Sequence, residues 1–170
     1  MSTEQSQPSF TGDDLETWSA FATVLEWLPA ALDAQLLRDA NLTHFEYGIL
    51  YALANAPEAT LRLSVLAGYA NSSLSRLSRA TTRLETRGWL RREPDPADGR
   101  YTLAVLSAAG RETFERATPG HVETVNRLVL GSLTKAQTKQ LREISTRISR
   151  AIRDEGEWHP SAATPTGPAV

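Results

Sequence analysis

Apolar residues recur at helical spacing over the first part of the chain. Between Leu15 and Leu36 they return every three to four positions, which places them on one face of a helix. The pattern predicts a first helix from Asp13 or Asp14 to Asp39, with a kink one turn before Pro29. The predicted stripe consists of Leu15, Trp18, Phe21, Leu25, Leu28, Leu32 and Leu36.

Three shorter helices are predicted next. The order Thr43-His44-Phe45-Glu46 has the spacing of a capping box, so a second helix should begin at Thr43 and stop before Pro57. A short helix is expected over residues 61–70. Another should run from Ser73, a good N-cap residue, to Thr86, and Gly88 is expected to serve as its C-terminal cap.

A β-hairpin is predicted after these helices. Strand-like segments over residues 89–93 and 101–106 flank a stretch, residues 94–99, that is rich in turn-forming residues. These segments carry the only β signal that the pattern gives. The hairpin is therefore expected to stand alone among helices.

The C-terminal part returns to helical periodicity. Ser107 is expected to cap a helix that reaches about Ala117, and Thr118-Pro119-Gly120 should bend or break it. A last helix should open at a second capping box, Thr134-Lys135-Ala136-Gln137. Its apolar face is formed by Leu141, Ile144, Ile148 and Ile152.

Short consecutive helices followed by a hairpin are the outline of a winged helix-turn-helix. The sequence thus predicts a mainly α fold with a small β-hairpin wing, in which the winged lobe covers about residues 42–106. Helices over residues 13–39 and 107–153 flank this lobe. The segments 1–12 and 154–170 have little to bury and are expected to be disordered tails.

The helix from Ser73 to Thr86 carries the predicted function. Its apolar positions fit a buried face, which leaves short hydroxyls and arginines on the exposed side. Arginine offers a planar fork to guanine or to phosphate oxygens, and serine can bond to base edges or phosphates. The first backbone N–H groups of the helix suit a phosphate. The DNA-binding candidates here are Ser73, Ser75, Arg76, Ser78, Arg79 and Arg83.

Composition narrows the class of protein. The chain has 170 residues, 41% of them hydrophobic, which is enough for the core of one domain. It has no cysteine, so disulfide scaffolds and thiol chemistry are excluded. No apolar run approaches the roughly 18 residues of a membrane span, and no secretory signal pattern opens the chain. We expect a soluble, cytoplasmic protein that does not associate with membranes.

Charge is distributed unevenly along the chain. The formal net charge is −2, but residues 1–59 carry −8, residues 60–100 carry +4 and residues 101–170 carry +2. An acidic chain with a concentrated arginine segment suggests a local anionic partner. The alternative is a solvated helix face on which the arginines are incidental.

Several short motifs follow one another at fixed spacing. With them the chain resembles the MarR-type transcriptional regulators over roughly residues 13–153, nearly all of its ordered part. The matching motifs are Leu66-Ala67, Ser73-x-Ser75-x-Leu77-Ser78-Arg79, Arg83-Leu84-Glu85-x-x-Gly88-Trp89-Leu90-x-Arg92, Asp95-Pro96-x-Asp98-x-Arg100 and Leu106-Ser107-x-x-Gly110.

The resemblance implies a sequence-specific DNA-binding regulator, with a repressor favoured. Such proteins look like obligate homodimers whose terminal helices interleave, so that two winged lobes grip successive major grooves of a pseudo-palindromic operator on double-stranded DNA. In the wing motif, the resemblance implies that Arg100 reaches the minor groove while Asp98 braces the wing. The apolar stripes on the two flanking helices independently favour dimerisation.

Family members often respond to small aromatic compounds bound between the dimer helices and the DNA-binding lobe. The ligand-binding candidates are Trp27, His44, Tyr47 and Tyr51, and the alternative for each is packing in the core or the dimer interface. No cofactor is implied. With three histidines and no cysteine, no metal site is expected, and ligation by His, Asp or Glu across a dimer is the alternative.

Two other classes of function are weighed against a regulator. No glycine-rich phosphate loop, nucleophile elbow or paired-carboxylate pattern is present, so the sequence gives no support to an enzyme. A winged-helix protein–protein interaction module, in which the arginine face meets an acidic protein, remains the alternative. The paired Asp98 and Arg100 at a glycine turn favour entry into a DNA groove over a protein interface.

Overall fold

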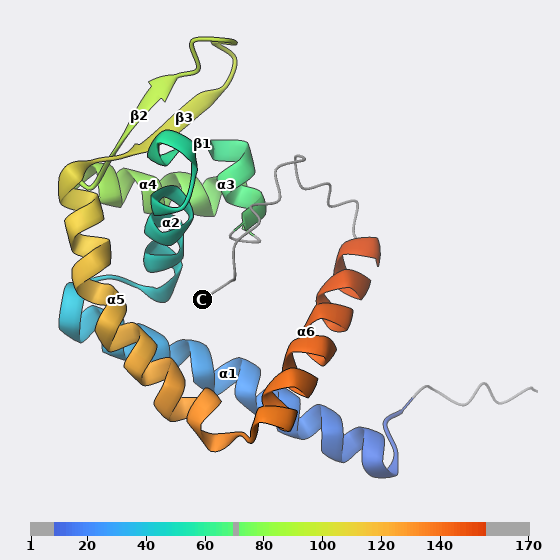
Figure 1. Ribbon diagram of the computed structural model, residues 1–170. Coiled ribbons are helices and arrows are strands. Elements are labelled where there is room, and N and C mark those ends of the chain that lie inside the picture. Colours follow the sequence, from blue (N-terminus) through green and yellow to red (C-terminus); the bar gives the residue numbers. More distant parts are fainter. Residues whose placement is uncertain (1–8, 70–71, 156–170) are drawn as a thin grey trace, which may run out of the picture. The chain divides into compact units, whose positions relative to one another are not determined.

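The computed structural model describes residues 9–69 and 72–155 (Figure 1). The chain forms two compact units, one ending at Ala31 and the other beginning at Leu32. Helix α1 (Gly12–Ala40) contributes to both units and matches the extent predicted for the first helix. The predicted tails fall largely on residues 1–8 and 156–170, which lie outside the described residues.

The first unit is built around the N-terminal part of α1. The ring of Phe10 stacks on that of Trp18 with centroids 6.0 Å apart, and Trp18 also contacts Phe21. The helix continues through Pro29 without a break. Its apolar side chains are largely exposed, and they include Leu15, Trp18, Phe21, Val24, Leu25 and Trp27.

The second unit contains most of the secondary structure. After the end of α1 it holds helices α2 to α6, two short 3₁₀ helices and three strands. In chain order these are α2 (His44–Ala54), η1 (Pro57–Ala59), β1 (Thr60–Arg62), α3 (Leu63–Tyr69), α4 (Leu74–Thr86), β2 (Leu90–Pro94), β3 (Thr102–Leu106), α5 (Ala108–Leu128), η2 (Leu130–Ser132) and α6 (Lys135–Glu155).

The three strands form an antiparallel sheet in the order β1-β3-β2. The predicted hairpin is confirmed: Leu90 pairs with Leu106 and Pro94 with Thr102, and Figure 1 shows the hairpin projecting from the helices. The prediction that this hairpin carries the only β structure is wrong. Residues 61 and 62, predicted as the start of a helix, instead belong to β1, which pairs with β3 so that Thr60 lies opposite Val105.

A leucine-rich core holds the winged lobe together. It joins the end of α1 to helices α2, α3 and α4 and to strands β2 and β3. Each buried leucine contributes roughly 1.5–3 kcal/mol, so this cluster is the main source of the lobe's stability. Its fully buried members include Leu36, Leu42, Leu50, Leu53, Leu66, Leu77 and Leu84.

A Schellman motif connects α4 to the hairpin. Gly88 has φ +72°, a conformation that glycine adopts without strain. Its N–H donates to the Glu85 carbonyl at 2.8 Å, and the Trp89 N–H donates to the Leu84 carbonyl at 3.0 Å. The predicted glycine cap is confirmed, and the motif turns the chain from α4 directly into β2.

Helix α5 neither ends near Ala117 nor breaks at Thr118-Pro119-Gly120, so the predicted break is wrong. The helix runs unbroken from Ala108 to Leu128 with Pro119 inside it. Its buried residues Ala117, His121 and Thr124 are held by tertiary packing, and the Tyr47 hydroxyl of α2 lies 3.1 Å from the Thr118 hydroxyl. This packing outweighs the roughly 3 kcal/mol that a proline costs in a helix interior.

Helix α6 starts at the predicted capping box. The Thr134 N–H donates to Gln137 Oε1 at 2.9 Å, and the Gln137 N–H donates to Thr134 Oγ1 at 3.3 Å. The helix buries none of its apolar side chains in this chain alone. Its exposed stripe consists of Leu141, Ile144, Ile148 and Ile152.

Candidate nucleic-acid interface

Helix α4 presents two faces of different chemistry. Ser73 caps it, with its hydroxyl oxygen accepting from the Arg76 N–H at 3.2 Å. The buried face is the one predicted, namely Leu77, Ala80, Thr81 and Leu84. The exposed face carries the predicted hydroxyl and arginine residues, which are Ser73, Ser75, Arg76, Ser78, Arg79, Thr82 and Arg83.

Two of the arginines on the exposed face also contact helix α2. The guanidinium of Arg76 lies 4.3 Å from the centroid of the Phe45 ring. Arg83 Nε donates to Glu46 Oε1 at 2.8 Å. The sequence prediction assigned both arginines to DNA. It missed Phe45 as the partner of Arg76 and Glu46 as the partner of Arg83, although the capping-box spacing had already singled out the Glu46 carboxylate.

The wing carries the predicted pair at its turn. Arg100 donates from Nε and Nη2 to the Asp98 carboxylate, at 2.9 and 2.7 Å, and these hydrogen bonds lower the pKa of Asp98 below its ordinary value. The Arg100 side chain is 85% exposed. The guanidinium is therefore oriented by Asp98 while remaining accessible to a ligand from solvent.

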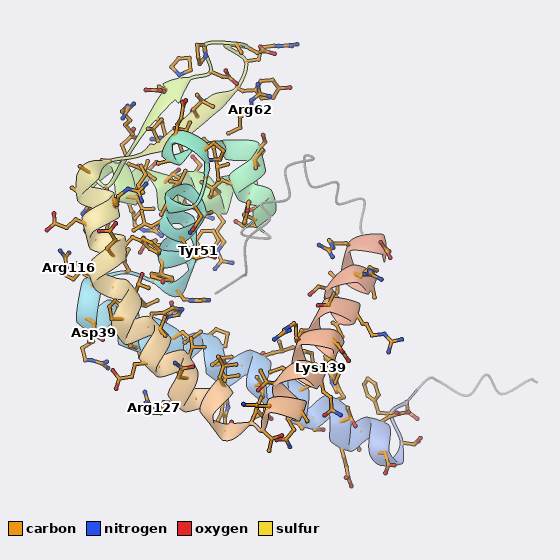
Figure 2. The ribbon with its side chains drawn as sticks, in the orientation of Figure 1. Asp39, Tyr51, Arg62, Arg116, Arg127 and Lys139 are labelled. Atoms are coloured by element: carbon orange, nitrogen blue, oxygen red, sulfur yellow. The ribbon has the colours of Figure 1, made fainter. Side chains whose placement is uncertain are left out.

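The turn end of the hairpin has a second ion pair, which sequence reasoning missed. Arg62 on β1 donates from Nε to Asp95 Oδ2 at 2.7 Å, and its guanidinium lies 4.4 Å from the centroid of the Tyr101 ring. Figure 2 shows Arg62 beside the end of the hairpin that carries the turn. The Ala97 N–H and Arg62 both lower the pKa of Asp95. No signal in the sequence indicated β1, so the position of Arg62 could not be predicted.

Three of the four ligand candidates lie in one aromatic cluster between α2 and α5. The His44 and His121 rings have centroids 5.5 Å apart, and Tyr47 lies 4.4 Å from His121. Phe114 contacts Tyr47 and Tyr51 at 5.5 and 6.1 Å. Phe114 was not among the candidates, because its position on α5 relative to α2 depends on tertiary packing.

The cluster is polar as well as aromatic. His121 is 1% exposed, and the Nδ1 atoms of both His44 and His121 have no hydrogen-bond partner within the described residues. Burial lowers the pKa of both histidines and raises that of Tyr47. The fourth ligand candidate, Trp27, belongs to the first unit and is 74% exposed.

Over residues 9–69 and 72–155, no three His, Asp or Glu side chains gather as the ligands of a metal ion would. None of the described helices has the length and apolar character needed to cross a membrane.

Comparison with known proteins identifies the family. The MarR family model matches residues 40–100, the segment that holds α2, α3, α4 and most of the wing. The crystal structure of Sco3205, a MarR family transcriptional regulator from Streptomyces coelicolor in complex with DNA, is 38% identical to this chain. The match covers 88% of this chain and 94% of Sco3205, with a TM-score of 0.83. The chain belongs to the MarR family of transcriptional regulators.

Two further relatives, of which AbsC is a MarR family transcriptional regulator, support this assignment. AbsC, also from Streptomyces coelicolor, is 30% identical, with a TM-score of 0.83 and coverage of 88% of this chain and all of AbsC. The transcriptional regulator HosA of Escherichia coli O111:H- is 29% identical over 111 residues, which are 65% of this chain and 80% of HosA. These relatives are regulators rather than enzymes.

The MarR assignment confirms the main interpretation of the sequence. The fold is the predicted helical one with a small winged sheet, and the function is that of a DNA-binding transcriptional regulator. The protein-only interaction module is not favoured. Which residues contact DNA, and whether an effector binds, remain predictions.

Proposed function

We propose that this MarR family protein acts in the cytoplasm as a homodimeric repressor that binds a pseudo-palindromic operator. Helix α4 of each lobe would lie in the major groove, and Arg100 of each wing would enter the adjacent minor groove. The observation that carries this proposal is the composition of the exposed face of α4, where short hydroxyls alternate with arginines and no large apolar side chain interrupts them between Ser75 and Arg83.

The wing supports the proposal through charge and geometry. The minor groove attracts arginine through its negative potential but distinguishes little beyond A·T from G·C. Arg100, held by Asp98 and exposed, fits this role as a contact that strengthens binding to all sequences. The serines and Arg79 of α4 fit base-edge and phosphate contacts in the major groove.

The dimer is supported by the apolar stripe that α6 exposes. Four large aliphatic side chains share one exposed face of that helix, and an exposed apolar patch of this kind marks an interaction surface. Two copies of one lobe related by a two-fold axis would read two half-sites of a pseudo-palindrome. Occupying such a site at a promoter would exclude other proteins from it, which is the basis of the proposed repression.

Titration of Arg100→Ala tests the proposed interface. The probe is a duplex selected by the wild-type protein from a random-sequence library, compared with a scrambled duplex at several salt concentrations. Loss of one phosphate-like contact should weaken binding to both duplexes and reduce the salt slope by about 0.9. Arg116→Ala is the matched control, because Arg116 lies on α5 away from the hairpin (Figure 2). A wild-type protein that selects no duplex at low salt would overturn the proposal.

We further propose that an aromatic effector binds at the cluster of His44, Tyr47, Tyr51 and His121. The supporting observation is that the Nδ1 atoms of His44 and His121 are buried without a hydrogen-bond partner among the residues that the structure describes, a costly arrangement that a ligand or water could satisfy. The test uses 4-hydroxybenzoate as the probe. Binding should raise the thermal midpoint of the free protein, and Tyr47→Phe should reduce that rise; equal midpoints with and without the probe would count against this ligand.

A further inference from the structure

The eight arginines of residues 60–100 differ in what they contact. Seven have a hydrogen bond, ion pair or ring contact with another described residue, and the side chain of Arg79 has none. The pairs are Arg62 with Asp95, Arg76 with Phe45, Arg83 with Glu46, Arg87 with the Asn41 carbonyl, Arg91 with Glu93, Arg92 with Glu85, and Arg100 with Asp98.

The partners of Arg76 and Arg83 are neighbours in the first turn of α2. Arg76 and Arg83 are seven residues apart, about two helical turns, so their side chains leave α4 on the same face. One packs over the Phe45 ring and the other bonds to the Glu46 carboxylate. Both arginines therefore connect the exposed face of α4 to one short segment of α2.

Glu46 is fixed independently of α4. It is only 2% exposed, and its Oε2 accepts from the Thr43 N–H at 3.0 Å while its own N–H donates to Thr43 Oγ1 at 3.1 Å. A buried carboxylate of this kind requires charged or hydrogen-bonding partners. Arg83, which is half exposed, is the cation that lies against it. The capping box thus provides a rigid anchor, and Arg83 connects α4 to it.

We infer that Glu46 is a positioning residue for helix α4 and acts through Arg83. The contact between Arg76 and Phe45 is a second connection between α4 and α2. In this arrangement Arg79 is the arginine of α4 that remains available to read a base edge. The inference rests on the proposed contact of α4 with the major groove. It reassigns Arg76 and Arg83 from direct DNA contacts to connections between helices α4 and α2.

Substituting Glu46 separates this arrangement from a direct contact of Arg83 with phosphate. If Arg83 only binds phosphate, Glu46→Gln removes a negative charge near the DNA and should strengthen binding to every sequence. If Glu46 positions α4, the same substitution weakens the charge-assisted bond to Arg83 and loosens the helix. A direct phosphate contact therefore predicts that Glu46→Gln binds DNA more tightly, whereas the positioning role predicts that it binds DNA more weakly.

The experiment is a double-mutant cycle in the full chain. Glu46→Gln and Arg83→Gln should each weaken binding to the selected duplex about tenfold, and the double variant should bind no more weakly than either single variant. In both single variants, the slope of the logarithm of the binding constant against the logarithm of the salt concentration should stay at the wild-type value. Additive losses, or binding by Glu46→Gln as tight as wild type, would overturn the inference. Glu112→Gln on α5 is the matched control and should bind as wild type does.

A second measurement needs no DNA. Glu46→Gln and Arg83→Gln should each speed the hydrogen exchange of the α4 amides relative to those of α5, and Glu112→Gln should not. Unchanged α4 exchange in both variants overturns the inference even if DNA binding is weakened. If the wild-type protein binds no duplex, the proposed function fails, while hydrogen exchange still tests the connection between α4 and α2.

The variant Arg79→Ala tests whether Arg79 reads a base edge. It should leave α4 exchange unchanged, because the exposed Arg79 side chain makes no hydrogen bond, ion pair or ring contact with the described residues. It should reduce the preference for the selected over the scrambled duplex by about tenfold, the effect of losing one base contact. An unchanged preference would show that Arg79 does not read the sequence and would overturn its assignment.

Discussion

At the scale of single residues, the pair formed by His44 and His121 shows how burial controls protonation. The Asp33 carboxylate of α1 accepts from the His44 backbone N–H at 2.6 Å, and the Tyr47 ring of α2 lies 4.4 Å from the His121 ring. Burial lowers the pKa of both imidazoles, and His44 lowers that of His121 further. Asp33 opposes this effect on His44.

The lowered pKa values predict that the protein loses stability in mild acid. In the unfolded chain both histidines bind protons as the pH falls through about 6.5, whereas in the folded chain they do so only at lower pH. The unfolded state then binds more protons, so the free energy of unfolding falls as the pH decreases below about 6.5. Urea unfolding between pH 5 and 8, at fixed protein concentration, measures this slope.

His121→Gln is the test variant for this pH dependence. It removes one of the two titrations while keeping a polar side chain, so the slope below pH 6.5 should become shallower whatever the change in absolute stability. If the variant and the wild type have the same slope, the buried imidazole is not the source of the pH dependence.

At the scale of elements, two glycines in helices should respond oppositely to alanine. A Cβ at Gly110, in the first turn of α5, would overlap the Trp89 carbonyl, whereas a Cβ at Gly48 of α2 meets nothing within 4 Å. Gly110→Ala should lower the free energy of unfolding by about 1–3 kcal/mol through overpacking. Gly48→Ala should raise it by about 0.5–1 kcal/mol, because alanine favours the helix. Denaturant unfolding of both variants measures the two changes in the free energy of unfolding. A Gly110→Ala variant as stable as wild type would contradict the close packing of α5 on Trp89.

Local signals predicted most elements, and tertiary contacts decided the rest. Capping boxes and apolar spacing located α2, α4 and α6 to within a residue or two, and the turn formers located the hairpin. Strand β1 was missed because three residues form a strand only when β3, about forty positions later, lies beside them. The helical course through Pro119 was missed for a similar reason, since packing of α5 against α2 stabilises it.

In the candidate interface too, the sequence predicted the features that depend on local geometry but not those that depend on long-range contacts. Helical periodicity correctly divided α4 into a buried and an exposed face, because that division depends only on local geometry. It could not distinguish Arg79 from Arg76 and Arg83, because Phe45 and Glu46 lie more than thirty positions earlier in the chain. The wing pair was predictable because Asp98 and Arg100 are two residues apart.

At the scale of the whole molecule, a single copy of the chain leaves an apolar face of α6 exposed to water and carries only one DNA-binding lobe. The exposed apolar stripe of α6 includes Ile144 and Ile148, and burying each such side chain contributes roughly 1.5–3 kcal/mol. Several of them together exceed the lower range of association costs. A single copy also carries one winged lobe, which can read only one half-site. A homodimer meets both conditions, and its two-fold symmetry should be visible in the DNA that it binds.

The spacing of the half-sites tests this symmetry. In a two-fold dimer the lobes reach half-sites about one helical turn, roughly 34–36 Å, apart. Inserting five base pairs between the half-sites rotates one of them by about half a turn, so only one lobe can bind and affinity should fall about tenfold or more. The same insertion outside the half-sites is the control and should have no effect. Ile148→Glu, which places a charge in the α6 stripe, should yield monomers by light scattering and bind both duplexes equally weakly. Equal affinity of the wild-type protein for the original and the internally lengthened duplex would mean that one lobe suffices.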